Sequence, residues 1–219
     1  MIPELIFLGA PASGKGTQTK MLARELNIPH IDTGGMLRTA VAEGTEYGKI
    51  AREYMEQGKL VSSEIVIGIV DERLHKPDTG NGFILDGFPR SIEQAEALDK
   101  ILLELNRDKN AKLQAINIDV PVSELVDRII NRRSCEKCGE IYNLKYKPPK
   151  IEGICDICGG KLIQRKDDSV EVAAQRIETY QKETAPLVQF YKDKGILVNI
   201  DGTRSIDEIY ADIKKVVLE

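Results

Sequence analysis

The sequence predicts an α/β protein with a five-stranded parallel sheet covered by helices on both faces. The first observation is a set of five short apolar segments, and the second is that stretches of helical character separate them. Parallel strands need such long crossovers, and strands buried on both faces are apolar along their whole length. The third observation is a glycine-rich loop directly after the first segment. The segments are residues 5–8, 29–32, 83–86, 113–119 and 196–201.

The glycine-rich loop reads Gly9-Ala-Pro-Ala-Ser-Gly-Lys-Gly-Thr17 and precedes a helical stretch, 15–26. Such a loop offers backbone N–H groups and a helix N-terminus to a polyphosphate, and Lys15 reaches the outer phosphates. Gly16 separates Lys15 from Thr17, so we expect magnesium to be held mainly through water and the nucleotide. The alternative is a turn without a ligand. The strand–loop–helix order favours a nucleotide enzyme of the P-loop NTPase type.

Start signals for the later helices are Ser62, Ser91, Pro121 and Asp168. Two stretches do not fit the alternation of strand and helix. Residues 33–61 are helical, with glycines that we expect to break the helix at positions 34, 35, 44, 48 and 58, and a cysteine-containing region follows from about residue 134 to 165. We expect both to be insertions on the ligand-binding edge of the sheet.

The four cysteines predict a metal site. Cys135, Cys138, Cys155 and Cys158 have the spacing C-x2-C-x16-C-x2-C, which is typical of tetrahedral zinc held by four thiolates. A glycine after each pair lets the backbone fold around sulfur. Two disulfides or iron in the same cage are the alternatives. Because four thiolates leave no open position, we expect structural zinc that staples a mobile flap.

Composition limits the class of protein. The chain of 219 residues is 42% hydrophobic and has a formal net charge of −4, which suits a globular core and argues against a general nucleic-acid binder. The apolar stretch 2–8 contains Glu4 and is too short to span a bilayer, and we read no secretory leader. We therefore expect a cytoplasmic protein without membrane or nucleic-acid partners.

Six motifs follow one another along the chain: residues 9–18, 32–38, 58–61, 85–90 with Gln94, 127–133 and 165–168. In this order they give the chain a resemblance to a known family, the adenylate kinases of the zinc-containing, long-lid type. The resemblance implies a core (1–31, 62–130 and 169–219), an AMP-binding insertion (32–61) and a zinc-binding lid (131–168), in a monomer. It also implies reversible transfer of the terminal phosphoryl group of Mg-ATP to AMP, giving two ADP.

The residue types suit this chemistry. The attacking phosphate oxygen is already ionised near neutral pH, so the site must supply charge neutralisation, alignment and exclusion of water rather than a base. Arginine forks bind phosphate oxygens in bidentate fashion. The alternative for each arginine is a solvated helix face, and for Asp86 a turn or capping carboxylate. The candidate catalytic residues are Lys15, Asp86, Arg90, Arg132, Arg165 and Arg176.

The resemblance also implies binding roles. Residues expected to contact ATP are Ala12, Ser13, Gly14, Lys15, Gly16, Thr17, Arg128, Arg132, Ile141, Tyr142 and Arg204. Residues expected to contact AMP are Thr33, Arg38, Lys59, Leu60, Val61, Gly87, Phe88, Pro89, Arg90, Gln94, Arg165 and Arg176.

Three of these residues have a second interpretation. Gln94 stands in Ser91-Ile-Glu-Gln94, which is also a capping box, although we favour contact with the adenine of AMP. Thr33 is either a helix cap or an adenine neighbour. Tyr142 either flanks ATP or packs within the cysteine hairpin.

Two residues depart from the pattern of the family. Ala12 stands where the loop normally has a glycine, and Gly35 stands where we expect an aspartate. Both departures bear on rate and nucleotide affinity. The resemblance further implies a cis Phe88–Pro89 bond, whereas we expect His30 and His75 to be structural.

Two other functions stay open from the residues alone. One is a kinase for another monophosphate, such as CMP or UMP. The other is a zinc-ribbon binding module with a nucleotide-sensing loop, although the scarcity of aromatic residues, 5% of the chain, argues against base stacking.

Overall fold

The five expected strands form one parallel sheet. The computed structural model describes residues 2–105 and 111–218, and the sheet order is β2-β3-β1-β4-β8 with every neighbouring pair parallel. β1 and β4 begin earlier than the sequence suggested, and β2 and β8 begin one residue later. The strands are β1 (Ile2–Leu8), β2 (His30–Asp32), β3 (Phe83–Asp86), β4 (Ala111–Asp119) and β8 (Leu197–Asp201).

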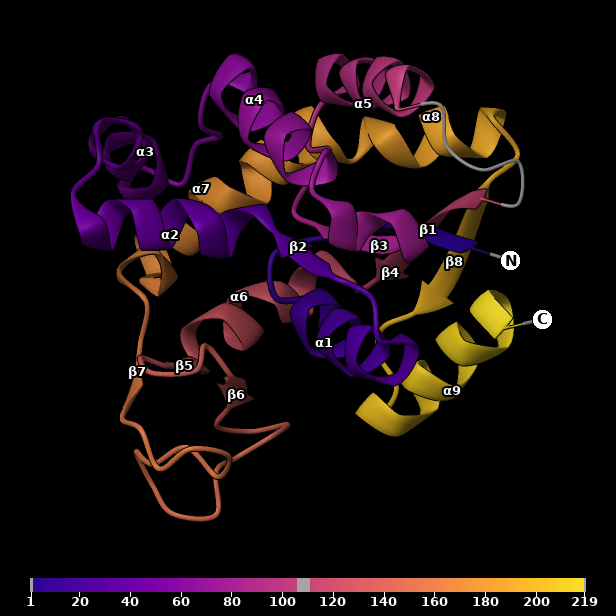
Figure 1. Cartoon of the computed structure of the whole chain (residues 1–219). Helices are drawn as coiled ribbons and strands as arrows, with labels where there is room; N and C mark the ends of the chain where they lie inside the picture. The colour runs from indigo at the N-terminus through magenta and orange to yellow at the C-terminus, as the bar shows by residue number, and fades with distance from the viewer. Residues whose placement is uncertain (1, 106–110, 219) are drawn as a thin grey trace.

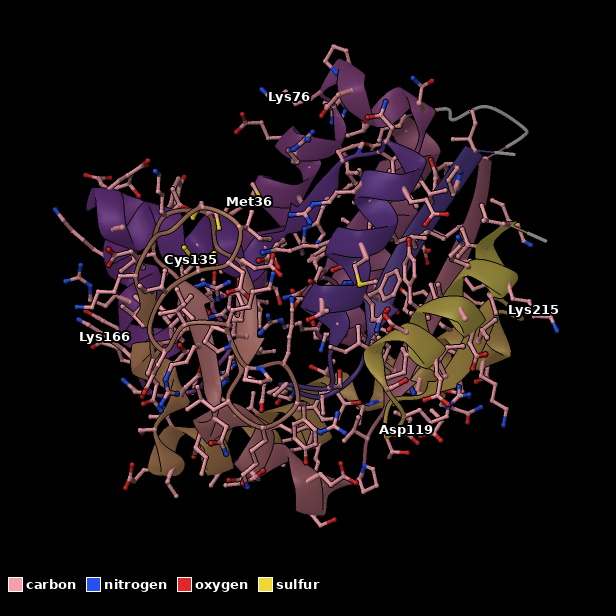
Figure 2. The ribbon with its side chains drawn as sticks, turned by 90° about the horizontal axis from the view of Figure 1, so that it is seen from below. Met36, Lys76, Asp119, Cys135, Lys166 and Lys215 are labelled. Carbon is pink, nitrogen blue, oxygen red and sulfur yellow. The ribbon has the colours of Figure 1, made fainter. Side chains whose placement is uncertain are left out.

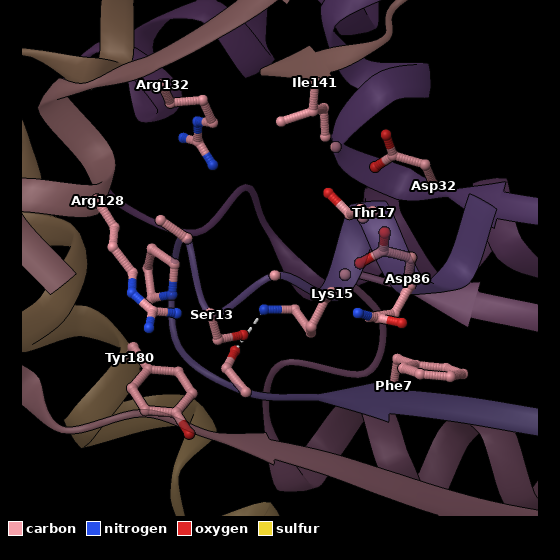
Figure 3. A pocket seen from close by; sticks show the side chains of 18 of the residues that line it. Phe7, Ser13, Lys15, Thr17, Asp32, Asp86, Arg128, Arg132, Ile141 and Tyr180 are labelled. Carbon is pink, nitrogen blue, oxygen red and sulfur yellow. Dashed lines mark hydrogen bonds between the residues drawn. The ribbon is translucent and has the colours of Figure 1, made fainter. Parts of the chain in front are cut away.

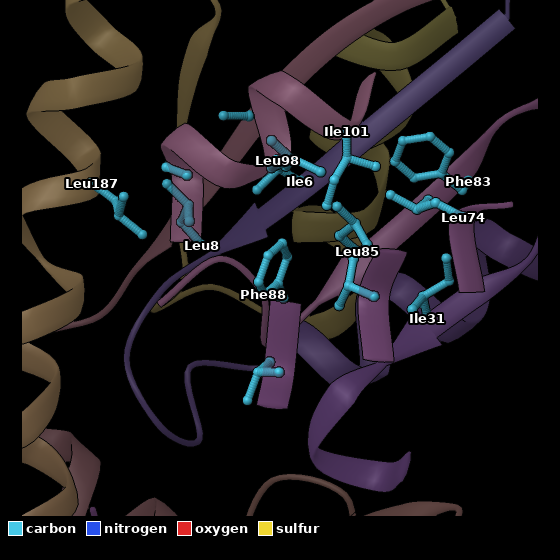
Figure 4. Packing of buried hydrophobic residues seen from close by; sticks show 14 of the residues in the cluster. Ile6, Leu8, Ile31, Leu74, Phe83, Leu85, Phe88, Leu98, Ile101 and Leu187 are labelled. Atoms are coloured by element: carbon cyan, nitrogen blue, oxygen red, sulfur yellow. The ribbon is translucent and has the colours of Figure 1, made fainter. Parts of the chain in front are cut away.

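Helices cover both faces of the sheet, as expected (Figure 1). Side chains of β1 alternate between the two faces, because successive residues of a strand point in opposite directions. Leu5 and Phe7 pack with α1 (Lys15–Leu26) and α9 (Ile206–Leu218). Ile6 and Leu8 pack in a second cluster with α4 (Ser63–Leu74), α5 (Ile92–Glu104) and α8 (Pro186–Asp193) (Figure 4).

The insertion between β2 and α4 is a pair of helices, α2 (Thr33–Glu43) and α3 (Glu46–Glu56). Gly44 ends α2 with φ +71°, as its role of breaker requires. Gly34, Gly35 and Gly48 were wrongly expected to break helices, since all three lie inside them. A Cβ on Gly48 would lie 2.0 Å from the carbonyl oxygen of Ala40, so its lack of a side chain lets α2 and α3 touch.

The cysteine region forms a small antiparallel sheet of its own. The strands β5 (Arg132–Cys135), β6 (Ile141–Asn143) and β7 (Leu162–Ile163) pair in the order β6-β5-β7. They follow α6 (Val122–Ile130) and lead through a short turn, η2 (Lys166–Asp168), into α7 (Val170–Thr179). In Figure 1 this region projects beside the main sheet. We call residues 131–168 the lid.

The helix start signals were mostly right. Ser62 and Ser91 cap α4 and α5, and Pro121 precedes α6. Asp168 does not cap α7, because Ser169 accepts the hydrogen bond from the backbone N–H of Val172. The remaining short elements are η1 (Pro77–Asn81) and a π-helical turn, η3 (Tyr180–Thr184). Among the described residues, no helix combines the length and apolar character needed to cross a bilayer.

One helix of the core offers a matched test of packing. Leu98 on α5 is 0% exposed, whereas Leu103 on the same helix is 81% exposed. We expect Leu98→Ala to lower the free energy of unfolding by about 2–5 kcal/mol, because it leaves a cavity. Leu103→Ala should change it by less than about 0.5 kcal/mol. Urea denaturation measures both values, and equal losses would contradict the packing described here.

Candidate active site

One cavity of about 990 Å³ lies at the carboxyl end of the sheet and is lined by the glycine-rich loop, α2, the lid and α7. β2 and β3 both end there, with Asp32 and Asp86 in register. Loops that follow parallel strands gather at this edge, which is the usual ligand site of open α/β sheets. Figure 3 shows Lys15 near its centre, with Arg128 and Arg132 on one side and Asp32 and Asp86 on the other.

Nearly all of the residues that the sequence assigned to nucleotide contacts line this cavity. Phe88 is the exception. Its side chain is 0% exposed and packs in the core with Leu85 and Leu98, so this side chain does not face the cavity. The neighbouring Pro89 does line the cavity, and the Phe88–Pro89 bond is cis, as the resemblance implied.

The glycine-rich loop curls around the ammonium group of Lys15. Its Nζ donates to the carbonyl oxygens of Gly9 at 2.6 Å and Ala10 at 2.9 Å. Ala12 has φ +62°, a left-handed conformation that a Cβ disfavours. The left-handed backbone is the reason why a glycine is expected at this position. This chain instead holds an alanine in that strained geometry.

Gly16 leaves room for a side chain of the lid. A Cβ at position 16 would lie 2.9 Å from Cδ1 of Ile141 on β6. That atom is the end of a flexible side chain, so a larger residue at position 16 would require the Ile141 side chain to shift.

The cavity concentrates positive charge on buried side chains. Burial lowers the pKa of Lys15 to about 8, although Asp86 opposes the shift. Burial also lowers the pKa of Arg165 to about 9, aided by Arg132 and Arg38. The pKa of Arg176 falls to about 10 through burial and the charge of Arg132. Crowded cations of this kind create a site that favours a polyanion.

Two neighbouring carboxylates hold the arginines, and the sequence did not identify their role. Asp168 is 0% exposed and accepts a bidentate pair of hydrogen bonds from Nε and Nη2 of Arg132. It also accepts from Nη1 of Arg176 at 2.8 Å. The carboxylate of Asp167 forms an ion pair with the same Nη1 at 2.8 Å, and the carbonyl oxygen of Asp167 accepts from it at 3.0 Å. Bidentate pairing fixes the plane of a guanidinium group, so the turn at 166–168 orients two of the candidate catalytic arginines.

Asp86 is ionised and held in place by two donors. Its Oδ2 lies 3.1 Å from Oγ1 of Thr19 and 3.2 Å from Nε2 of His30. Burial alone would raise the pKa of Asp86, but the contact with His30 and the charge of Lys15 outweigh it and lower the pKa to about 2. His30 was expected to be structural, and the structure places it in contact with this carboxylate.

The absence of a side chain at position 35 is explained by Asp32. A Cβ on Gly35 would lie 2.6 Å from Oδ2 of Asp32. Asp32 caps α2 by accepting a hydrogen bond from the backbone N–H of Gly35, and its Oδ2 lies 3.4 Å from Nη2 of Arg38. Because the carboxylate at 32 fills the space beside 35, this chain cannot carry a second one there without moving the first.

Gln94 and Thr33 occupy the far end of the cavity. The side-chain amide oxygen of Gln94 accepts from the backbone N–H of Arg90 at 2.8 Å, and the backbone N–H of Gln94 donates to Oγ of Ser91. Part of the capping interpretation is thus correct, although the side chain also lines the cavity. Thr33 does not cap α2, because Asp32 does; its hydroxyl donates to the carbonyl oxygen of Asp86.

Arg128 lies between the loop that precedes α9 and the lid. Its guanidinium group donates to the carbonyl oxygen of Gly202 at 3.0 Å and to Glu124 at 2.8 Å, and it lies 5.2 Å from the ring centroid of Tyr146. The sequence interpretation missed Tyr146, which lines the cavity. Arg204 lines the same end and pairs with Asp212.

Tyr142 packs within the cysteine hairpin. The side chain is 2% exposed. Its hydroxyl accepts from the backbone N–H of Asp156 at 2.8 Å and lies 3.5 Å from Sγ of Cys155. These contacts favour the packing interpretation over stacking against a nucleotide, although the residue borders the cavity.

The four cysteines form a preorganised cluster. All are free thiols, and their Sγ atoms lie within 4.8 Å of one another; Figure 2 shows Cys135 among other sulfur atoms in the lid loops. Two cross-pair Sγ distances are 3.5 and 3.6 Å, near the edge of about 3.8 Å expected for tetrahedral zinc with bonds of about 2.3 Å. Gly139 and Gly159 have φ +68° and +69°, so the glycines do shape the two turns.

The lid touches α1 directly. Nζ of Lys20 donates to the carbonyl oxygen of Gly139 at 2.5 Å. The next residue, Glu140, is buried, pairs with Lys147 at 2.5 Å, and has Lys20 and Arg24 each at 4.0 Å. A charge-assisted bond to a backbone carbonyl is stronger than a neutral one, so this contact fastens the cysteine hairpin to the core.

The fold and the site together define a phosphotransferase of the P-loop nucleoside monophosphate kinase class. A family model described as "Adenylate kinase" matches residues 7–196. The adenylate kinase of Archaeoglobus fulgidus is 52% identical over 214 residues, covering 98% of this chain and 97% of the relative. Those of Thermodesulfovibrio yellowstonii and Carboxydothermus hydrogenoformans are 52% and 50% identical over 96% of this chain and 96% and 97% of the relatives.

The chain therefore belongs to the adenylate kinase family, and its function is that of an adenylate kinase. The resemblance inferred from the motifs is confirmed. Neither a CMP or UMP kinase nor a non-catalytic zinc-ribbon module is favoured by these findings.

The contact of Lys20 with the lid can be tested by hydrogen exchange. We expect Lys20→Met to accelerate exchange at the backbone amides of β6, because the lid loses a charged bond to α1. Lys100→Met, which changes an exposed lysine on α5, serves as the control. Unchanged exchange in the Lys20 variant would show that the contact does not hold the lid.

Proposed function

We propose that this chain aligns Mg-ATP and AMP end to end in the cavity and transfers the terminal phosphoryl group with the residue roles set out below. The observation that carries the proposal is the convergence of five cations from separate segments on one cavity. Polyphosphates supply the negative charge that such a site lacks. The five are Lys15, Arg90, Arg132, Arg165 and Arg176.

The donor nucleotide is assigned to the glycine-rich loop. Residues 12–17 offer backbone N–H groups to its phosphates, and Lys15 exchanges its bonds to Gly9 and Ala10 for phosphate oxygens. Arg128 and Arg204 border the place for the donor base, with Ile141 and Tyr142 of the lid beside it. The hydroxyl of Tyr142 already accepts a hydrogen bond within the hairpin. We therefore assign Tyr142 to packing beside the donor nucleotide rather than to a hydrogen bond with it.

The acceptor is assigned to the other end of the cavity. Arg38 and Arg90 are placed to bind its phosphate, and Lys59, Leu60 and Val61 form the wall beside it. The oxygen of Gln94 is bound to the backbone of Arg90, so its amide nitrogen is the group available to the base, next to Thr33. Gly87 and Pro89 shape the turn that presents Arg90.

Catalysis is assigned to charge neutralisation in a dry site. Arg132, Arg165 and Arg176 are placed to neutralise charge that spreads over the transferred group. Asp168 keeps Arg132 and Arg176 oriented before any nucleotide arrives, which reduces the reorganisation needed during the reaction. No side chain has to act as a base.

Magnesium, which adenylate kinases use with ATP, fits the surroundings of Asp86. A carboxylate with a pKa of about 2 is ionised at neutral pH, and hard cations prefer oxygen ligands and retain waters. When bound, the ion neutralises phosphate charge. Asp86 and Thr17 are the residues that we assign to orienting its water shell.

We further propose that residues 32–61 and 131–168 close over a core made of the remaining segments. Closure excludes water, which would otherwise hydrolyse the activated phosphate. Structural zinc in the four-cysteine cluster would keep the lid rigid, since its thiolates leave no position for substrate. We expect the protein to act as a monomer in the cytoplasm, without nucleic-acid or membrane partners.

The choice of acceptor nucleotide tests the roles proposed for Gln94 and Thr33 in binding its base. ATP is offered with AMP, CMP or UMP in a coupled assay, and we expect AMP to be strongly preferred because Gln94 and Thr33 border the acceptor base. Gln94→Ala should raise the KM for AMP while leaving the KM for ATP unchanged. An unchanged KM for AMP would remove Gln94 from base recognition.

The role of Arg132 can be separated from simple ion pairing. Arg132→Lys should lower kcat by about 100-fold or more, since a lysine cannot hold Asp168 and a phosphate with one planar fork. Arg73 makes a similar bidentate pair with Asp78 at the surface, so Arg73→Lys is the matched control and should retain full kcat. Comparable losses in both variants would contradict the catalytic assignment.

Removal of the metal tests the structural role proposed for zinc in the lid. Elemental analysis should find zinc, and chelation should lower Tm while leaving the secondary structure of the core mostly intact. Each kcal/mol lost should lower Tm by about 2–4 °C in a chain of this size. Added zinc should restore the value. A lid whose hydrogen exchange and Tm do not respond to chelation would contradict the structural role.

A further inference from the structure

Gly58 is the place where the helical insertion meets the helix that carries Arg176. It follows α3 with φ +69°, and a Cβ added to it would lie 3.1 Å from Cγ of Arg176, 3.3 Å from the backbone nitrogen of Arg176 and 3.2 Å from the carbonyl oxygen of Val172. Two of these three atoms are backbone atoms of α7. A side chain at position 58 would therefore push the insertion away from α7 by a few tenths of an ångström rather than simply displace a flexible group.

A hydrogen bond fixes this approach. Oγ1 of Thr179 on α7 donates to the carbonyl oxygen of Gly58 at 3.2 Å. The contact thus consists of close backbone packing at Val172 and Arg176 and a polar bond one turn further along the same helix. Directly after Gly58 come Lys59, Leu60 and Val61, which form one wall of the cavity.

Arg176 is held from two sides. Its guanidinium group is bound by Asp167 and Asp168, at the end of the lid. Its aliphatic stem lies against Gly58, at the end of the insertion. Arginine stems contribute packing as well as charge, so the position of the guanidinium group depends on both contacts.

We infer that Gly58 is a positioning residue: its bare backbone lets the closed insertion press against the stem of Arg176 and so set the arginine for phosphoryl transfer. The inference rests on the catalytic role proposed above for Arg176. The cavity wall formed by residues 59–61 does not by itself require a glycine at position 58. That wall could form with the insertion slightly further from α7, whereas the contact with Arg176 could not.

Two glycines of this chain allow a controlled test. Gly44 has φ +71°, close to the +69° of Gly58, but a Cβ at position 44 would meet nothing within 4 Å. Gly58→Ala and Gly44→Ala therefore introduce the same backbone strain, and only the first disturbs Arg176. We expect Gly58→Ala to lower kcat at saturating ATP and AMP by about tenfold, since small misplacements of catalytic groups are costly. Gly44→Ala should retain kcat, and the KM for ATP should be unchanged in both.

A double-mutant cycle identifies the route of the effect. In an Arg176→Lys background, which shortens and reshapes the group being positioned, Gly58→Ala should cause no further loss of kcat. Thr179→Val removes the hydrogen bond without backbone strain and should lower kcat in the same direction, which keeps the test valid if Gly58→Ala unfolds the protein. Tm values of all variants verify folding.

Three outcomes would overturn the inference. One is a loss of kcat in Gly44→Ala as large as in Gly58→Ala. Another is an undiminished effect of Gly58→Ala in the Arg176→Lys background, which would show that position 58 does not act through the arginine. The third is an unchanged kcat in Arg176→Lys alone, which would reject the proposed role of Arg176 itself and is thereby distinguished from the second.

Discussion

The rest of the structure depends on placing several buried cations together around one cavity. Burial and mutual repulsion lower the pKa values of Lys15, Arg165 and Arg176, so this arrangement is unfavourable unless something holds the charges in place. Asp168 binds two arginines and is fully buried. Asp86 faces Lys15 from the end of β3. These carboxylates neutralise only part of the charge, and the remainder is what makes the cavity selective for polyphosphates.

The fold brings these groups together because parallel strands end at a common edge. Lys15 follows β1, Asp32 and Asp86 end β2 and β3, and Arg132 and Arg176 arrive from the lid and from α7. Each segment alone carries one or two charges, so none of them forms a phosphate site. The lid adds a second requirement, since its small sheet must stay rigid enough to present Arg132 and Arg165. The bond of Lys20 to Gly139 fastens the lid to α1, and the zinc proposed for the four-cysteine cluster would add to this.

Close approach explains several glycines that local sequence rules do not. Gly16 leaves room for Ile141 of the lid, Gly35 leaves room for the carboxylate of Asp32, and Gly48 lets α2 touch α3. Helix propensity alone would place breaks at 35 and 48, yet both lie inside helices, because the contact each one permits outweighs the modest cost of a glycine in a helix. Ala12 shows the reverse case, in which a left-handed conformation is kept without a glycine.

The sequence by itself determined the parallel sheet, the phosphate loop, the two insertions and the cysteine cluster, because each depends on residues close together in the chain: apolar runs, a loop motif and fixed cysteine spacing. The family resemblance located the arginines. Only the tertiary structure decided that Asp168 binds arginines rather than capping α7, that Phe88 lies in the core, that Tyr142 belongs to the hairpin, and that His30 contacts Asp86. Several of these outcomes depend on partners far away in the sequence: Tyr142 and Cys155 are 13 positions apart, Arg132 and Asp168 are 36 apart, and His30 and Asp86 are 56 apart. Local patterns carry no information about which distant side chain will be adjacent.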